Sequence, residues 1–264
     1  SIKNFKVGDL VIPPFFKGWN TGNMKEDTVL LSLGGKEDGV MQEFMKFEEN
    51  NLVHAPKKWN CIESATLPCA ALTAWRTLVT EGKVSTNSTV LVQGLGGVSI
   101  FAIQIAKLFN AKVIATTSSK ERMAKAKEIG ADHVINYNEE LNWWKKVQEI
   151  TNKKGVDIIV EVGGGKTLEQ SLKCSKTGAV IGIIGVLSGG IAELPIGRVI
   201  YKAVRLIGIS CGNKIELINM IEKFNSSNTR PIIDTIFNFS DLPNALRYMS
   251  KGTHLGKIAI DFEC

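Results

Sequence analysis

The sequence has no C-x-x-C pair, although it contains five cysteines. An odd number of cysteines without short spacings matches neither the disulfide framework of a small secreted domain nor the ligand set of a structural zinc site. We therefore expect reduced thiols and a cytoplasmic protein. The cysteines are Cys61, Cys69, Cys174, Cys211 and Cys264.

Long apolar runs are also missing. No stretch reaches the roughly 18 apolar residues that a membrane-spanning helix needs, and no signal peptide is visible. The formal net charge is +6, yet the basic residues form no run of five and are not interleaved with aromatic residues. We therefore expect neither a membrane nor a nucleic acid as partner. A mildly basic surface does suit an anionic cofactor.

A strand, a glycine-rich turn, a helix and a second strand are predicted to follow one another. Residues 89–92 are β-branched and apolar, apolar residues recur at helical spacing from residue 98, and residues 112–117 are again β-rich. In such a βαβ unit the free N–H groups of the first helical turn can bind a pyrophosphate. The G-x-G-x-x-G fingerprint has Ser99 at its last place, where a small residue suffices. The pattern predicts dinucleotide binding, and the alternative is a structural turn without a ligand.

The end of the second strand lacks the carboxylate that selects NADH. Asp or Glu usually stands there, about 20 residues after the first glycine, and holds the ribose 2′-hydroxyl. This chain has Thr117, Ser118, Ser119 and Lys120 instead, with Arg122 close behind. Hydroxyls and a cation can hold a 2′-phosphate through charge-assisted hydrogen bonds, which favours NADPH over NADH. Ser119 can also cap the next helix, and the two roles are compatible.

Strands and helices continue to alternate after this unit. Six strands joined by helices predict a parallel, doubly wound α/β sheet of the Rossmann type. Ligands bind at the carboxyl ends of such strands, and two ends carry glycine, at residues 161–163 and 184–186. These glycines leave room for a nicotinamide ribose, or else they only make tight turns. The further strands are expected at residues 131–137, 156–162, 179–185 and 205–210, and the helices between them at 142–151 and 167–174.

The two ends of the chain are expected to form a second domain. Residues 1–64 have a β-like pattern, with strands predicted at 40–47 and 51–55. A helix is predicted at 65–81, with Gly82 at its end. The C-terminal part alternates helix and strand and should return to the N-terminal part. We expect a β-rich domain at 1–64, a dinucleotide-binding domain at 65–212 and a returning segment at 213–264.

Taken together, five ordered motifs resemble the medium-chain dehydrogenase/reductase superfamily, most closely its quinone-reductase-like and zinc-type alcohol dehydrogenase-like branches. They are VGDLV (7–11), ATLPCAALTAW (65–75), VLVQGLGGV (90–98), IGADHVINY (129–137) and GKI (256–258). The resemblance implies a Rossmann domain and a GroES-like catalytic domain. The first motif normally lies much further into the chain, so we expect the first part of the catalytic domain to be absent from this sequence.

The resemblance implies a cofactor site. Its pyrophosphate loop is Gly94, Leu95, Gly96, Gly97 and Val98, and its 2′-phosphate segment is Ser118, Ser119 and Lys120. Thr73 is implied to line the nicotinamide pocket, Tyr137 to lie beside the adenosine half, and Lys257 to lie near the pyrophosphate. The strand ends along the nicotinamide side are Val162, Gly163, Ile184, Gly185 and Val186.

The expected function is NADPH-dependent transfer of hydride to a small carbonyl, quinone or enone, without zinc. No catalytic acid can be named from the sequence. One alternative is a zinc-dependent alcohol dehydrogenase whose remaining ligands lie in absent N-terminal residues. Another is a catalytically inactive fragment that only binds NADPH. Family members often pair through an edge strand of the cofactor domain, so the apolar stretch 191–201 predicts a homodimer.

Overall fold

The structure is a computed structural model that describes residues 2–262. Its contacts divide the chain into two compact units, Thr73–Ser210, here called the sheet unit, and Ser1–Leu72 with Cys211–Cys264, here called the terminal unit. The two ends of the chain therefore share one unit. The first boundary falls inside a helical run instead of at residue 65, and the predicted domain limits stay a prediction.

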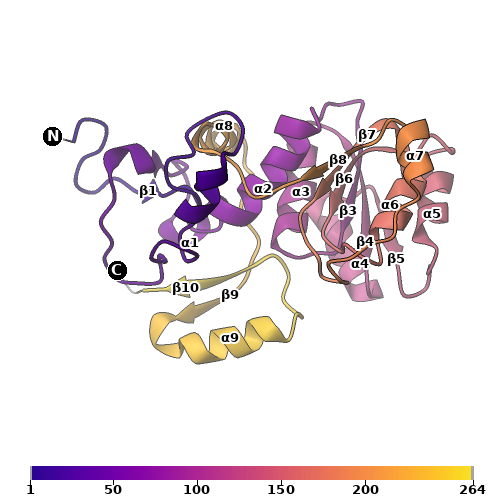
Figure 1. Cartoon of the computed structure of the whole chain (residues 1–264). Helices are drawn as coiled ribbons and strands as arrows, with labels where there is room; N and C mark the ends of the chain where they lie inside the picture. The colour runs from indigo at the N-terminus through magenta and orange to yellow at the C-terminus, as the bar shows by residue number, and fades with distance from the viewer. Residues whose placement is uncertain (1, 263–264) are drawn as a thin grey trace. The chain divides into compact units, whose positions relative to one another are not determined.

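The sheet unit contains a six-stranded, fully parallel sheet in the order β5-β4-β3-β6-β7-β8, which confirms the predicted fold class (Figure 1). Its strands are β3 (Thr89–Gln93), β4 (Lys112–Thr117), β5 (His133–Asn136), β6 (Val156–Glu161), β7 (Ser175–Ile183) and β8 (Arg205–Gly208). Its helices are α3 (Gly97–Leu108), α4 (Lys120–Ile129), α5 (Trp143–Ile150), α6 (Leu168–Cys174) and α7 (Ile196–Tyr201).

Side chains that alternate along the strands build a core on each face of this sheet. Leu91 of β3 and Ile159 of β6 point to the face that α5 and α6 cover, where they are fully buried with Trp143 and Val147. Helix α3 packs on β3 and β4. The strand order reverses between β3 and β6, and a crevice forms beyond the carboxyl ends of strands at such a point. The fold therefore places the glycine turn after β3 beside the end of β6.

The helical run predicted at residues 65–81 is present, but two of its segments are π-helical. It consists of η3 (Leu67–Ala71), α2 (Leu72–Trp75) and η4 (Arg76–Glu81), with Gly82 as C-cap, as predicted. A short helix, α1 (Cys61–Ser64), precedes it. A π-turn carries one extra residue, which hydrophobic spacing does not reveal, and such turns are frequent at functional sites.

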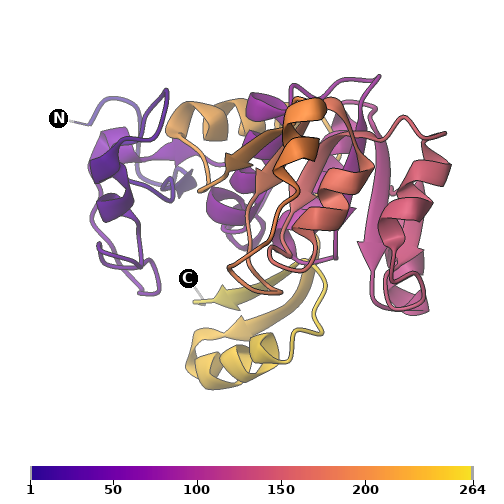
Figure 2. The same ribbon diagram turned by 45° about the vertical axis from the view of Figure 1, so that its right-hand side comes forward.

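The terminal unit contains little sheet. Strands β1 (Val11–Ile12) and β2 (Val53–His54) pair antiparallel, and β9 (Ile233–Asn238) and β10 (Lys257–Asp261) pair parallel. Helix α9 (Leu242–Ser250) packs along β9 and β10 (Figure 2). The remaining elements are α8 (Lys214–Asn225), η1 (Glu26–Leu31), η2 (Glu49–Asn51) and η5 (Phe239–Asp241).

The strand predicted at residues 40–47 is wrong. This segment is irregular, and Val40, Met41 and Phe44 are largely exposed. A β pattern forms a strand only where a neighbouring strand offers hydrogen-bonding partners and a face to pack on, and the described residues offer none here.

The predicted edge strand at residues 191–201 is also wrong. The second half of this stretch is helix α7, and the edge strand of the sheet is β8. Ile191, Ile196, Ile200 and Tyr201 are exposed. The homodimer stays a prediction.

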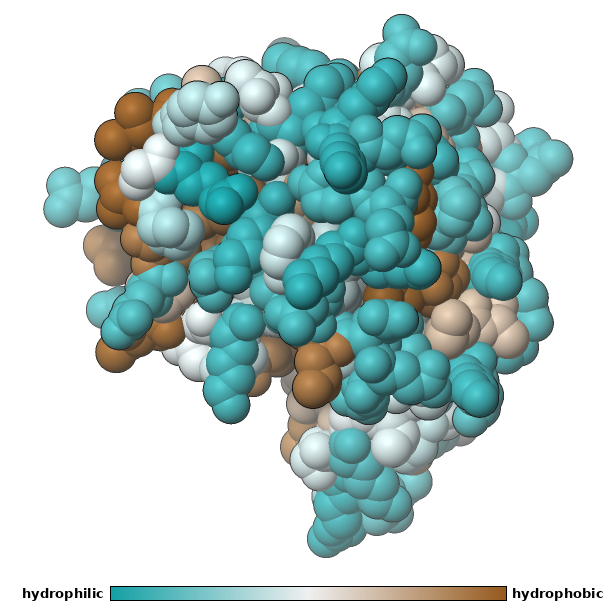
Figure 3. All heavy atoms as spheres, turned by 90° about the vertical axis from the view of Figure 1, so that its right-hand side faces the viewer, coloured by the Kyte–Doolittle hydropathy of each residue, from teal (hydrophilic) through white to brown (hydrophobic). Residues whose placement is uncertain are grey.

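No helix within residues 2–262 has the length and apolar character needed to cross a membrane. The face shown in Figure 3 is mostly hydrophilic, with small hydrophobic areas between polar side chains.

Candidate functional site

The glycine turn after β3 leads into a helix whose first turn has no side-chain cap. Gly94 has φ +69°, which favours glycine, whereas Gly96 has an extended backbone with φ −77°. No acidic residue lies in the first turn of α3, and Ser99 Oγ donates to Gln93 O at 2.6 Å. The free N–H groups and the helix dipole therefore make this terminus suitable for an anion.

Open space lies beside Gly96. A Cβ atom built on this residue meets no protein atom within 4 Å, and its backbone angles are open to any residue. Neither strain nor packing within the protein thus requires glycine here. Open space beside the backbone is what a closely approaching ligand needs.

The loop after β4 caps the next helix and leaves polar side chains accessible. Ser119 Oγ accepts from Arg122 N at 3.3 Å and caps α4, and buried Thr117 donates to Ser119 O at 3.4 Å. Lys120 is exposed and Ser118 is half-exposed. The cap confirms the structural role of Ser119. Ser118 and Lys120 lie on the accessible side of the loop.

The loops after β4 and β5 are held together at the same edge. Tyr137 N donates to Thr117 O at 2.9 Å, and Asn138 Nδ2 donates to Ser118 O at 2.8 Å. Tyr137 is 40% exposed, so its ring is available to a ligand. Sequence reasoning missed Asn138, although its place directly after a strand was a usable signal.

A cavity of about 730 Å³ lies in the sheet unit. A volume of this size is typical of small-molecule sites. It brings together four predicted residues, Gly94, Tyr137, Val162 and Gly163. It adds polar residues that were not predicted, namely Gln93, Thr116, Asn138, Lys166, Thr167, Gln170 and Ser188.

A buried carboxylate organises the wall of this cavity. Glu161, at the end of β6, is 0% exposed and accepts hydrogen bonds from five donors, which suits an ionised carboxylate because it can only accept. It thereby holds the loop between β6 and α6. The donors are Gln93 Nε2 (2.7 Å), Ser171 Oγ (2.5 Å), Thr167 Oγ1 (2.5 Å) and the backbone amides of Gly163 and Gly164 (3.0 Å each).

Close packing, against the backbone at Gly185 and against a side chain at Gly163, explains the glycines that follow β6 and β7. A Cβ on Gly185 would lie 2.6 Å from Val162 O, and a Cβ on Gly163 would lie 2.2 Å from Thr167 Oγ1. The tight-turn interpretation therefore accounts for these glycines with or without a ligand. A cofactor role for Val162, Gly163, Ile184, Gly185 and Val186 stays a prediction.

The other thirteen predicted site residues do not line this cavity, among them Gly96 and Lys120, and two of the thirteen are Thr73 and Lys257. Thr73 is 4% exposed on α2, where its carbonyl accepts from Thr77 Oγ1 at 2.8 Å. Lys257 belongs to the terminal unit and starts β10. Their predicted cofactor roles stay predictions.

A cavity of about 400 Å³ in the terminal unit contains two thiols and a cation. Cys61, Cys69 and Lys257 line it, together with Leu10, Ile12 and Phe15 among others. Cys69 is exposed.

A second thiol lies against Cys69. Cys211 Sγ donates to Pro68 O at 3.0 Å. Its side-chain hydrogen bond to Cys69 lowers the pKa of that thiol to about 6, with partial burial opposing the shift and the charge of Lys257 adding to it. None of the four described cysteines is in a disulfide, and Cys264 lies outside the described residues.

No group of three or more His, Cys, Asp or Glu side chains within residues 2–262 could hold a metal ion.

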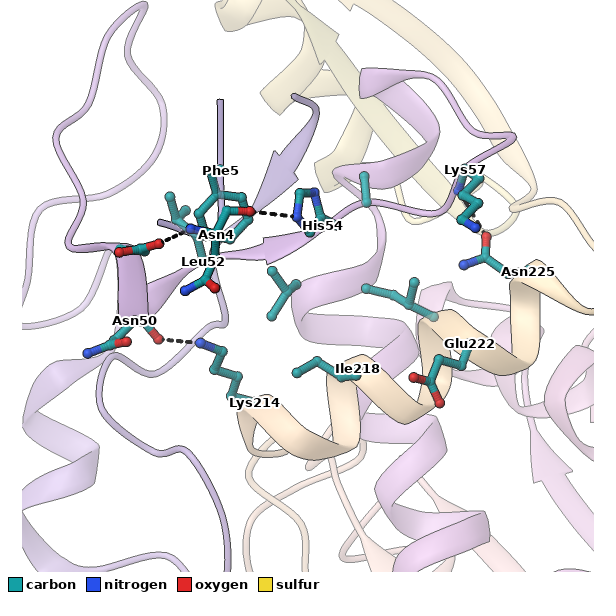
Figure 4. A pocket seen from close by; sticks show the side chains of 14 residues that line it. Asn4, Phe5, Asn50, Leu52, His54, Lys57, Lys214, Ile218, Glu222 and Asn225 are labelled. Atoms are coloured by element: carbon teal, nitrogen blue, oxygen red, sulfur yellow. Dashed lines mark hydrogen bonds between the residues drawn. The ribbon is translucent and has the colours of Figure 1, made fainter. Parts of the chain in front are cut away.

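Another cavity of about 410 Å³ in the terminal unit lies between α8 and β2 (Figure 4). Polar groups at its rim pair with one another. Lys214 Nζ donates to Asn50 O at 2.6 Å, and Lys57 N donates to Asn225 Oδ1 at 2.9 Å. Leu52 and Ile218 contribute apolar surface. This arrangement presents no cluster of reactive groups, and we assign it no chemistry.

Comparison with known proteins agrees with this geometry. Residues 97–226 match the family described as zinc-binding dehydrogenase. The zinc-type alcohol dehydrogenase-like protein C1773.06c of Schizosaccharomyces pombe is 35% identical over 99% of this chain and 78% of its own length. Acryloyl-coenzyme A reductase of Sulfurisphaera tokodaii is 28% identical over 98% of this chain and 78% of its own length.

The solved structures agree as well. The structure of an NAD-dependent alcohol dehydrogenase superposes with a TM-score of 0.87 at 29% identity, covering 98% of this chain and 77% of the other. These similarities confirm the resemblance that the five motifs indicate. The chain belongs to the medium-chain dehydrogenase/reductase superfamily of oxidoreductases.

Proposed function

We propose that this oxidoreductase binds NADPH at the carboxyl edge of its sheet and reduces a conjugated carbonyl compound. The observation that carries the proposal is the open space beside Gly96 at the uncapped start of α3. A dinucleotide pyrophosphate matches both features, because it is anionic and needs close approach to the backbone.

The preference for NADPH rests on the loop after β4. Exposed Lys120 and half-exposed Ser118 supply a cation and a hydroxyl, and no carboxylate ends this strand. A 2′-phosphate would gain charge-assisted hydrogen bonds here. The similarity to an NAD-dependent alcohol dehydrogenase makes NADH the competing cofactor to test.

Bound nicotinamide cofactor supplies the hydride. The role of the chain's own residues is to bind and orient the cofactor. The amides of the α3 terminus hold the anionic part of the cofactor, and the five hydrogen bonds to Glu161 keep the β6–α6 loop in one conformation. A rigid wall of this kind keeps reacting groups in position.

The acceptor class is supported by the similarity to acryloyl-coenzyme A reductase, whose substrate is a conjugated thioester. Conjugated enones, quinones and simple carbonyls share the electron-poor carbon that accepts hydride. The proposed reaction needs no zinc.

A zinc-dependent alcohol dehydrogenase is the second candidate. The zinc-binding dehydrogenase family match and the zinc-type relative favour it. Measurement of bound zinc, with alcohol oxidation assayed before and after chelation, decides between the two. Stoichiometric zinc and activity lost on chelation would replace the first candidate by the second.

The test of cofactor binding is titration with NADPH and NADH, followed by nicotinamide fluorescence. Gly96→Ala places a methyl group where the phosphates should lie, and no protein atom opposes it. We expect the fold and melting temperature to be kept and NADPH affinity to fall about tenfold or more, equivalent to about 1.4 kcal/mol. Gly197→Ala is the matched control, since its Cβ also meets no atom within 4 Å.

The test of cofactor choice is Lys120→Asp. Loss of a charge-assisted hydrogen bond, about 1.5–3 kcal/mol, should weaken NADPH about ten- to a hundredfold and leave NADH nearly unchanged. Wild-type protein that binds NADH as tightly as NADPH would refute the role of this loop. Gly96→Ala protein with unchanged affinity for both cofactors would refute the site itself.

A further inference from the structure

Two cysteines that are far apart in the sequence meet in the terminal unit. Cys69 lies on the π-helical segment η3, and Cys211 lies in the segment before α8. Cys211 Sγ lies 3.0 Å from Pro68 O and 3.8 Å from Cys69 O, and the Cys211 side chain is near enough to lower the pKa of the Cys69 thiol. The Cys211 thiol therefore lies against Cys69, although the two residues are far apart in the sequence.

The two thiols differ in access. Cys69 is exposed and opens into the cavity of about 400 Å³ described above, whereas Cys211 is 5% exposed. A solvent-borne reagent therefore reaches Cys69 first. Lys257 lines the same cavity and acts on Cys69 with its positive charge, which favours the thiolate.

The backbone holds Cys211 in an uncommon conformation. Its φ is +62°, in the left-handed region that residues other than glycine rarely adopt. Such a conformation is strained and persists where the surroundings impose it. In this conformation the Cys211 thiol donates a hydrogen bond to Pro68 O of η3.

We propose that Cys69 and Cys211 form a two-cysteine redox site that a hydroperoxide converts to a disulfide. This proposal is independent of the proposed cofactor and substrate. Its reagent is hydrogen peroxide or an organic hydroperoxide, and the apolar lining of the cavity by Leu10, Ile12 and Phe15 admits the organic kind.

The chemistry has two balanced steps. The Cys69 thiolate attacks one peroxide oxygen, the O–O bond breaks, and Cys69 is oxidised by two electrons to a sulfenic acid while the other oxygen takes a proton and leaves as water or an alcohol. The Cys211 sulfur then attacks Cys69 Sγ, the S–S bond forms, and the S–O bond breaks. The hydroxyl group leaves as water with the Cys211 proton.

The other two described cysteines are Cys174 and Cys61. Cys174 is buried, and burial raises the pKa of its thiol to about 12, so it is unreactive. Cys61 lines the same cavity and is exposed, which makes it both the competitor and the control.

The test is treatment of the native protein with equimolar hydrogen peroxide, followed by mass spectrometry of the intact chain and of peptides. We expect loss of the mass of two hydrogen atoms and a cross-linked peptide that joins Cys69 to Cys211, reversed by dithiothreitol. Cleavage at Glu63 separates Cys61 from Cys69 in the peptide map. A Cys69–Cys61 or Cys69–Cys264 bond, or no disulfide at all, overturns the proposal.

Variants identify the order of the steps. Cys211→Ser should stop at a sulfenic acid on Cys69 that dimedone traps, and excess peroxide should then oxidise it further to the sulfinic acid. Cys69→Ser should abolish the disulfide, and Cys61→Ser should leave its formation unchanged. Wild-type protein that accumulates sulfinic acid on Cys69 as fast as Cys211→Ser shows that Cys211 does not act, which overturns the proposal.

Discussion

Replacement of Glu161 by Gln tests whether the buried carboxylate organises the cavity wall. The change keeps the shape of the side chain but turns one of its two acceptor oxygens into an N–H₂ donor group. One oxygen faces two backbone amides and Thr167, and the other faces Gln93 and Ser171. Since all five partners donate, the new amide must oppose donors in either orientation.

The magnitude follows from the partners. The amide nitrogen should take the place nearer Ser171, whose hydroxyl can rotate to accept. Gln93 cannot turn over without loss, because its Oε1 accepts from Val162 N and Gly163 N at 3.2 Å each. One buried donor left unsatisfied costs about 1–3 kcal/mol, and the remaining bonds lose their charge assistance. We expect a total loss of about 3 kcal/mol in the free energy of unfolding.

Differential scanning calorimetry measures this effect. A loss of about 3 kcal/mol corresponds to a fall in melting temperature of roughly 6–12 °C for a chain of this size. Glu216→Gln is the matched control, because Glu216 is also buried but takes part in a capping box, where Gln serves as well as Glu. Equal melting temperatures for the two variants would refute the network's importance.

Three further predictions concern packing, thiol reactivity and pH. Gly185→Ala should lower the melting temperature by several degrees, because its Cβ would lie 2.6 Å from a backbone oxygen, whereas Gly208→Ala, with no atom within 4 Å, should not. Cys174, with its pKa raised to about 12 by burial, should resist iodoacetamide at about pH 8 until the protein is unfolded. Burial raises the pKa of Asp132, but hydrogen bonds from a β4 amide and Lys107 outweigh it and lower the pKa overall. The stability that ionised Asp132 contributes is therefore present above its unfolded pKa and is lost as the pH falls through its folded pKa. When the pH falls below about 4, the melting temperature of Asp132→Asn should therefore decrease less than that of the wild type.

Local sequence patterns predicted most of the strands and helices of the sheet unit. The strand predicted at residues 112–117 has those limits in the structure, and Ser119 caps α4 as expected. These features were predictable because they depend on neighbours in the sequence. A continuous apolar, β-branched run suits a buried parallel strand, and a serine side chain reaches the amide three residues on.

Only the tertiary structure decided the features that depend on distant residues. The strand expected at 40–47 is irregular because the described residues provide it with no partner. Glu161 is stabilised by Gln93 and Cys69 contacts Cys211, pairs separated by 68 and 142 residues in the sequence. No spacing rule joins such residues, since their contact arises from the strand order and from the return of the C-terminal part to the N-terminal part. The sequence alone located the turn at Gly94 and Gly96, and the fold showed that Gly94 adopts a left-handed backbone conformation whereas Gly96 lies beside open space.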